Sequence, residues 1–206
     1  MKGATETVEF NCLRCGSCCH EYEFADGMNF KRIPVFPEEL DELEVFAKEN
    51  GILIKFLEDV VFPDIKNKRI IVVTYRIVLE GSEKCCPFFQ ASRGCLVNEI
   101  KPLACKAYPL AQKKIDAYTQ EMYIDPYCRF IEGNEIQVKN AAIENIKSLF
   151  ASELDFSARL MKKNQEIILK LKQLTVEGKI LIPEKVSTND MDIWLRTWDR
   201  AYIKDY

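Results

Sequence analysis

Four cysteines fall within eight residues of the segment FNCLRCGSCCHEYEF (residues 10–24), in the pattern Cys12-x2-Cys15-x2-Cys18-Cys19. Two cysteines separated by two residues can direct both sulfur atoms at one point, as they do in tetrahedral zinc sites and iron–sulfur proteins. Three cysteines at this spacing seldom arise from packing alone, so the segment predicts a metal site. In a bacterial ferredoxin run the fourth ligand would stand at residue 22, which is Tyr22 here. The fourth ligand must therefore come from a distant part of the chain.

Five more cysteines follow, and they supply the candidates for that ligand. All nine cysteines lie between residues 12 and 128, and residues 129–206 contain none. Cys86 precedes Pro87, as a ferredoxin ligand does, so we favour Cys86 as a ligand and its neighbour Cys85 as a small packing residue. The other candidates are Cys95, Cys105 and Cys128. Eight thiolates would complete two four-cysteine sites and leave one cysteine over.

The adjacent pair Cys18-Cys19 bears on the number of sites. Neighbouring residues of an extended chain point to opposite sides. We therefore expect the two sulfur atoms to face different ways and to serve two sites. His20, the only histidine, follows directly. It could ligate a metal or carry a proton, but we favour a local hydrogen-bonding role for it.

Basic residues lie close in sequence to the cysteines and could offset the charge of about −2 that four thiolates give to a zinc ion or an oxidised four-iron cluster. Chance occurrence explains them equally well. They are Arg14, Arg93, Lys101, Lys106 and Arg129.

Composition narrows the class of protein. The 206-residue chain has a net charge of −3, which gives no support to nucleic-acid binding. The N-terminal MKGATETVEF has no apolar signal region, and no apolar run is long enough to span a membrane. We expect a cytoplasmic protein, in which clustered thiols indicate metal chemistry rather than disulfides. No phosphate-binding loop, dinucleotide fingerprint or nucleophile elbow is present.

The pattern of the chain predicts an α+β fold that changes character near residue 130. Pro37 and Gly51 bound a predicted helix. Strands are expected at residues 52–62, 69–79 and 116–125, and a short helical turn at 98–110 with Asn98 as its cap and Pro109 as its end. We predict a loop-rich cysteine domain over residues 1–130 and a helical extension, residues 131–206, that packs on it.

The extension shows helical periodicity. Its first apolar face carries Ile136, Ala142, Ile143, Ile146, Leu149 and Phe150, and its second carries Leu160, Ile167, Ile168, Leu171 and Leu174. The second helix is expected to stop near Gly178, and Ser187 to cap a last helix that contains Ile193, Trp194, Leu195, Trp198 and Tyr202.

The segments FNCLRCGSCCHEYEF, CPFFQASRGCLVNEIKPLACKAYPL and YCRF resemble the CxxCxxCC cysteine-cluster family, also called YkgJ-like, a family associated with zinc or iron chelation. The resemblance covers about residues 10–130. Lys101 and Lys106 stand where the family usually has arginines, which keeps the charge but loses the bidentate fork. The resemblance implies that the metal-binding and cofactor-binding residues are Cys12, Cys15, Cys18, Cys19, Cys86, Cys95, Cys105 and Cys128, with Cys85 as the extra cysteine.

Three functions are consistent with this pattern. The preferred one is a [4Fe–4S]-type iron–sulfur protein that serves electron transfer or the maturation of a partner protein bound by the helical tail. The alternatives are a structural zinc module that mediates interactions, and a cluster-dependent modifying enzyme similar to the lysine N-methylase found in one branch of the family. The sequence assigns no catalytic residue to the enzyme.

Overall fold

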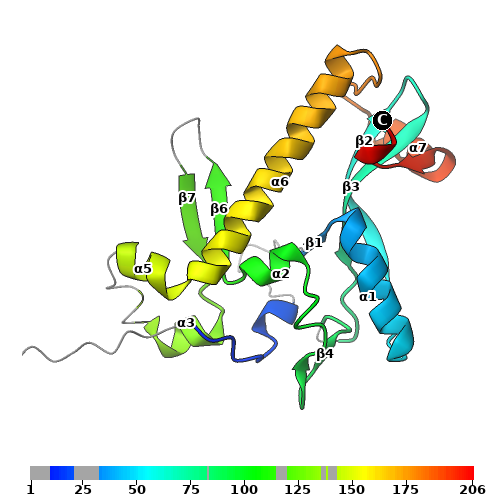
Figure 1. Cartoon of the computed structure of the whole chain (residues 1–206). Coiled ribbons are helices and arrows are strands. Elements are labelled where there is room, and N and C mark those ends of the chain that lie inside the picture. The colour runs from blue at the N-terminus through cyan, green and yellow to red at the C-terminus, as the bar shows by residue number, and fades with distance from the viewer. Residues whose placement is uncertain (1–9, 21–32, 83, 115–119, 136–137, 139–142) are drawn as a thin grey trace, which may run out of the picture. The chain divides into compact units, whose positions relative to one another are not determined.

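The computed structural model describes residues 10–20, 33–82, 84–114, 120–135, 138 and 143–206. Their backbone contacts form two compact units, each built from two chain segments. The cysteine unit comprises the described residues of 1–31 and 79–161, and the sheet unit comprises those of 32–78 and 162–206. The fold is α+β, as predicted, with helices α5 and α6 after a strand-rich first part (Figure 1). The domain division near residue 130 stays a prediction.

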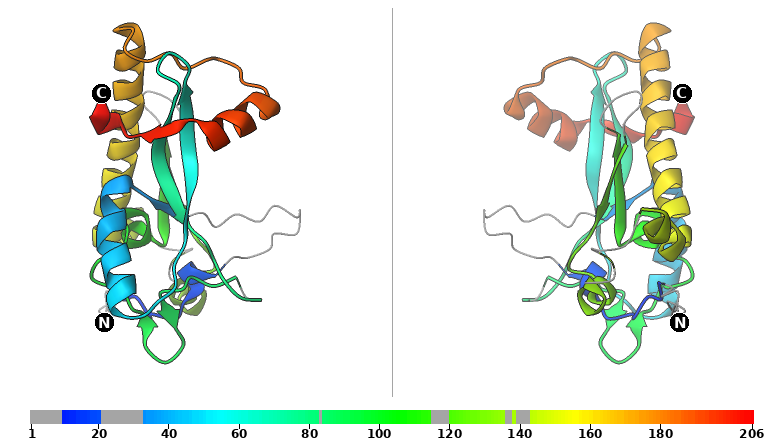
Figure 2. Two further views of the ribbon diagram at one scale, coloured as in Figure 1. Left: turned by 90° about the vertical axis from the view of Figure 1, so that its right-hand side faces the viewer. Right: turned by 90° about the vertical axis from the view of Figure 1, so that its left-hand side faces the viewer.

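The sheet unit is built around strand β3 (Arg69–Ile77), which pairs antiparallel with β2 (Phe56–Asp64) and with the short β1 (Pro34–Val35). Four consecutive β-branched residues, 70–73, make β3 a buried central strand. The two long strands predicted from the sequence are thereby confirmed. They form a hairpin that is visible in both views of Figure 2.

Helix α1 (Pro37–Glu49) begins and ends as its sequence predicts. Pro37 occupies the first helical turn, and the Glu39 carboxylate accepts the backbone N–H of Phe36 at 2.8 Å. Gly51 has a φ of +63°, a conformation that glycine adopts without strain just after a helix.

Helix α6 (Ala151–Val176) contributes its first residues to the cysteine unit and the remainder to the sheet unit. In the sheet unit, its buried Leu171 and Leu174 pack with Ile71 and Val73 of β3 and with Ile180. The predicted helix that ends near Gly178 is confirmed, although Ile168 is half exposed rather than part of the buried face.

The C-terminal segment departs from its prediction. Helix α7 (Thr188–Thr197) is capped by Ser187, whose hydroxyl accepts the backbone N–H of Asp190 at 3.0 Å. The helix ends before Trp198, and Asp199–Ala201 forms strand β8, which pairs in parallel with β3. Tyr202 lies beyond this strand, before the 3₁₀ turn η2 (Ile203–Asp205). The expectation that Trp198 and Tyr202 lie on the last helix was therefore wrong.

The cysteine unit consists of short elements. In chain order they are η1 (Ser17–Cys19), β4 (Phe89–Gln90), β5 (Gly94–Cys95), α2 (Leu103–Ala107), β6 (Leu110–Lys114), β7 (Gln120–Ile124), α3 (Arg129–Gly133) and α5 (Ile143–Leu149), followed by the start of α6. Strands β4 and β5 pair as one hairpin, and β6 and β7 as another (Figure 1). Helix α2 is capped at Pro102, not at Asn98 as expected. Ile136 and Ala142, two residues of the predicted helical face, lie outside the described residues.

An aromatic and aliphatic core joins these short elements. Phe150 is fully buried and packs with Phe130, Ile131 and Leu110. Phe10 joins this core, with its ring centroid 5.0 Å from that of Phe130, and its N–H donates to the Leu149 carbonyl at 3.2 Å. The start of the cysteine-rich segment is thereby held against the helices. None of the helices in the described part of the chain is both long and apolar enough to cross a membrane.

Candidate metal centre

Six cysteines line one small cavity of about 30 Å³ in the cysteine unit: Cys12, Cys15, Cys18, Cys19, Cys95 and Cys128. Cys86 lies beside them, because its backbone N–H donates to the Cys19 carbonyl at 2.8 Å. The structure thus brings together seven of the eight cysteines predicted as ligands. Cys105, on helix α2, is not among the residues that line the cavity.

A glycine turn positions the first cysteines. Gly16 has a φ of +83°, which reverses the chain after Cys15 and begins the 3₁₀ turn that carries Cys18 and Cys19. A Cβ atom at residue 16 would overlap the Phe89 ring. The Cys19 N–H closes the turn on the Gly16 carbonyl at 2.7 Å. Only glycine satisfies both the backbone angle and the close approach of the ring.

His20 extends the same turn. Its ring nitrogen Nδ1 donates to the Gly16 carbonyl at 2.8 Å, and its ring lies 5.6 Å from that of Phe89. This contact agrees with the local hydrogen-bonding role that we favoured for His20.

The β4–β5 hairpin brings Cys95 to the cavity. Gly94, with a φ of +75°, lies so close to the first segment that a Cβ there would stand 2.7 Å from the Cβ of Arg14. The N–H of Leu96 donates to the Phe88 carbonyl at 2.9 Å and fixes the hairpin. Two glycines, at residues 16 and 94, therefore allow the two cysteine segments to approach each other.

The sulfur atoms of Cys18 and Cys19 lie 3.7 Å apart. The expectation that they face opposite sides was wrong, because it assumed an extended chain, whereas these residues lie on a 3₁₀ turn. Tetrahedral zinc sites have Zn–S bonds of about 2.3 Å, which places their sulfur atoms about 3.8 Å apart. The observed pair matches one edge of such a tetrahedron.

The surroundings shift the pKa values of the cysteine thiols in different directions. Burial would raise the pKa of Cys15, but hydrogen bonds from the Ser17 side chain, at 3.2 Å, and from the backbone N–H groups of Ser17 and Arg129 outweigh it and lower that pKa. Burial raises the pKa values of Cys95 and Cys128. The surroundings therefore favour the thiolate form of Cys15 and the neutral thiol form of Cys95 and Cys128.

Cys19 shows how closely the thiols interact. The hydrogen bond with Cys18 lowers its pKa, but the hydrogen bond with Cys86, together with burial, outweighs this and raises it. Neighbouring thiolates repel one another in this way, and a bound cation reverses the effect by stabilising the charged form. The donor set is suited to a cation that accepts soft sulfur ligands.

The rest of the cavity wall is apolar or basic. Aromatic rings of Phe10, Phe89, Tyr108 and Phe130 line it, and so do Arg14 and Lys101. These two belong to the basic residues that the sequence placed near the cysteines. The aromatic lining was not predicted, because Phe10, Phe89 and Phe130 reach the cavity only through the tertiary fold.

Within the described ranges, no three Cys, His, Asp or Glu side chains already lie at the distances that hold one ion. Cys18 and Cys19 form a ready pair, and the other sulfur atoms of the cavity would have to move toward them.

One family model matches the chain over residues 11–129, more than half its length. Its description is "CxxCxxCC: Putative zinc- or iron-chelating domain". Neither the search of curated proteins nor the search of solved structures returned a match. The matched range contains all seven cysteines that the structure brings together, and Cys105 and Cys85 as well.

Proposed function

The chain belongs to the CxxCxxCC family of zinc- or iron-chelating domains, and on that premise we propose that its cavity binds a single metal ion, zinc or iron, through four cysteine thiolates. The observation that carries this proposal is the 3.7 Å separation of the Cys18 and Cys19 sulfur atoms at a cavity lined by four further cysteines. That distance fits two ligands of one tetrahedral ion.

The remaining two ligands come from the segments that meet this pair. Cys86 is hydrogen-bonded to Cys19 through both its backbone and its side chain, and Cys95 is close enough to Cys18 and Cys12 for their charges to interact. We assign Cys18, Cys19, Cys86 and Cys95 to this ion. The two-segment arrangement would join residues 12–20 to residues 85–96 and so stabilise a region that has little regular structure.

An iron–sulfur cluster is the second candidate, and a different observation favours it. Cys12, Cys15 and Cys18, which have ferredoxin-like spacing, line the same cavity as Cys128, and aromatic rings shield that cavity. A cluster held by these four cysteines would carry electrons or serve the maturation of a partner protein bound by the helical tail. Each of the four cysteine thiolates would bind a different iron of the cluster.

Metal analysis of serine variants separates the two candidates. The full chain is purified without exposure to air, and bound zinc, iron and acid-labile sulfide are counted. We expect one zinc or iron ion without sulfide, and loss of that ion in Cys19→Ser and Cys86→Ser. Cys85→Ser is the matched control and should retain the ion. Cys85 neighbours Cys86, but its thiol is directed to the Cys86 carbonyl, at 3.7 Å, whereas the thiol of Cys86 interacts with Cys19.

Iron with stoichiometric sulfide, lost in Cys12→Ser and Cys128→Ser but retained in Cys19→Ser, would instead establish the cluster. Protein that carries no metal after air-free purification, and that takes up none when zinc or ferrous iron is added, would contradict both assignments.

A further inference from the structure

A second cavity, of about 410 Å³, lies entirely within the sheet unit. This volume is in the range of sites that bind small molecules. The residues around it come from the start of α1, the middle of β3, the second part of α6 and the C-terminal turn η2. The cavity is separate from the cysteines, so what it binds does not depend on the proposed metal function.

The inner wall of this cavity is apolar. Phe36, Val72 and Val73 are at most 6% exposed, and Ile167 and Ile203 complete the wall. A ligand with a hydrocarbon body would release water from these surfaces, and apolar burial contributes about 25 cal/mol per Å². The inner wall therefore selects for an apolar body of small cross-section.

The rim of the cavity is basic. Three lysines line it, Lys163, Lys170 and Lys204, against one acidic residue, Glu38. Lys163 is occupied, because it forms an ion pair with Glu38 and its Nζ lies 3.7 Å from the centroid of the Phe36 ring. Two positive charges are left in excess.

Lys170 and Lys204 carry that excess. In the described part of the chain, neither forms an ion pair with a carboxylate, and Lys204 lies 5.5 Å from the centroid of the Tyr202 ring. Lys170 reaches the cavity from α6 and Lys204 reaches it from η2. Their ammonium groups can donate hydrogen bonds to an anionic group at the cavity mouth.

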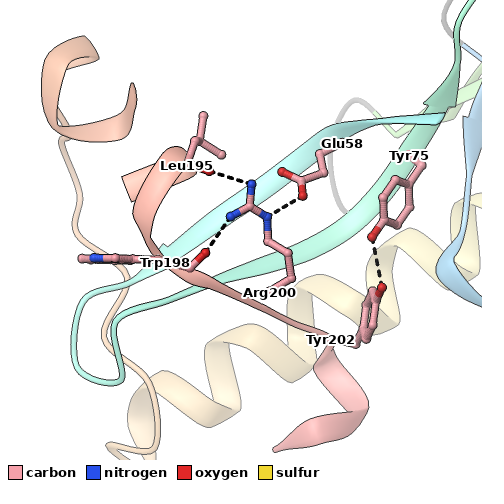
Figure 3. Close-up of polar contacts among 6 residues, drawn as sticks. All are labelled: Glu58, Tyr75, Leu195, Trp198, Arg200 and Tyr202. Atoms are coloured by element: carbon pink, nitrogen blue, oxygen red, sulfur yellow. Dashed lines mark hydrogen bonds and ion pairs between the residues drawn. The ribbon is translucent and has the colours of Figure 1, made fainter. Parts of the chain in front are cut away.

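The wall that carries Tyr202 and Lys204 is fixed in place. The Tyr202 hydroxyl is hydrogen-bonded to that of Tyr75 at 3.0 Å, as Figure 3 shows. Just before it, Arg200 pairs with Glu58 of β2 and donates to the carbonyl groups of Trp198, at 2.7 Å, and Leu195, at 2.8 Å. These contacts fix the segment that precedes Lys204 without any ligand, which reduces the ordering cost of binding.

We propose that this cavity binds a small aliphatic carboxylate, with its chain against Phe36, Val72 and Val73 and its carboxylate between Lys170 and Lys204. The apolar inner wall accounts for the body, and the two lysines account for the charge. Glu38 is paired with Lys163, so two of the three lysine charges at the cavity remain for the anion.

Calorimetric titration of the full chain with octanoate tests this proposal, with 1-octanol and inorganic phosphate as probes of the two halves of the ligand. We expect saturable one-to-one binding of octanoate, and binding of 1-octanol and phosphate weaker by about tenfold or more, because each lacks one set of contacts. Equal binding of octanol would show an unspecific apolar site and overturn the assignment of the lysines.

Variants locate the site. Lys170→Gln and Lys204→Gln should each weaken octanoate binding about tenfold, which corresponds to the loss of one weak hydrogen bond to a charged group. Lys172→Gln, exposed on the same helix but outside the cavity, is the matched control and should bind as the native chain does. Ile167→Trp fills the cavity from a half-buried helix position. It should abolish octanoate binding and leave the far-ultraviolet circular dichroism, which reports secondary structure, unchanged. Octanoate binding that survives Ile167→Trp, or its absence in the native chain, would overturn the proposal.

Discussion

Cys18 and Cys19 lie on a tight turn, and this local geometry determines which metal site the chain can form. Their sulfur atoms are 3.7 Å apart because the 3₁₀ turn brings neighbouring side chains to one side. The sequence predicted both residues as ligands, but the prediction of their directions assumed that side chains alternate as they do along a strand, and this was wrong. Gly16, two residues before Cys18, was the available signal, since glycine is the residue that most readily adopts a left-handed backbone conformation in a turn.

Replacement of Gly16 by alanine should damage the metal centre. A side chain at a φ of +83° costs about 1–2 kcal/mol by itself, and here its Cβ would also overlap the Phe89 ring. We expect Gly16→Ala to lose most of its bound metal and to unfold at lower urea concentration. Gly81→Ala is the matched control, because Gly81 has a φ of +75° with open space around it, so it should show the backbone cost alone and retain the metal. Equal metal content in the two variants would contradict the packing role of Gly16.

Asp64 is a fully buried carboxylate at the end of β2, and its hydrogen bonds join three parts of the sheet unit. It accepts the side chain of Asn67 at 2.5 Å, the N–H of Leu181 at 3.0 Å and the hydroxyl of Tyr206 at 2.9 Å. Burial would raise its pKa, but these hydrogen bonds outweigh burial and lower it.

A lowered pKa in the folded state means that ionised Asp64 stabilises the sheet unit above its ordinary pKa, and that this stability is lost as the pH falls through the lowered value. We expect Asp64→Asn to reduce the free energy of unfolding by about 1–3 kcal/mol at pH 7, and the difference from the native chain to shrink in acid below about pH 4. Both tryptophans lie in the sheet unit, so urea unfolding followed by their fluorescence measures it. A difference that stays constant from pH 7 to pH 3 would contradict this account.

Elements with a strong periodic pattern were predictable, and those defined by a distant partner were not. Helix α1 and strands β2 and β3 carry their own signals: a proline at the start, a glycine at the end, or a run of β-branched residues. Strand β8 has only three residues, and it is defined by its pairing with β3, in which Arg200 lies opposite Ile70. Tyr202, just after the strand, continues the helical spacing of Trp194 and Trp198, so the pattern alone extended the predicted helix too far.

We infer that the contacts of Arg200 fix the position at which α7 ends. Its guanidinium binds Glu58, the carbonyl group of Leu195 in the last helical turn and that of Trp198 just beyond it, which lysine cannot do with one ammonium group. We expect Arg200→Lys to lower the free energy of unfolding by about 1–2 kcal/mol and to alter the near-ultraviolet circular dichroism of the stacked Trp194–Trp198 pair, whose rings lie 4.6 Å apart.

Arg196→Lys provides the comparison for this prediction. Arg196 forms an exposed ion pair with Asp192 one turn away, a contact worth only about 0.3–0.5 kcal/mol. Its replacement should leave both the stability and the dichroism nearly unchanged. If Arg196→Lys and Arg200→Lys have equal effects, the network around Arg200 does not hold the C-terminal segment.

At the scale of the whole molecule, the range that matches the cysteine family does not coincide with either compact unit. Cysteine spacing predicted a metal region that the family match over residues 11–129 supports. The same residues contribute to both compact units, because 32–78 belong to the sheet unit. The approach of Cys19 to Cys86 and of Cys15 to Cys128 depends on contacts between segments about 70 and 110 residues apart in the chain, which local patterns do not encode.

X-ray absorption at the metal edge of the full chain, purified without exposure to air, tests the central claim most directly. We predict a first shell of four sulfur atoms at about 2.3 Å with no second metal nearby, as expected for one ion between Cys18, Cys19 and their partners. A first shell of nitrogen or oxygen atoms in place of sulfur, or a short metal–metal distance, would contradict the single-ion thiolate site.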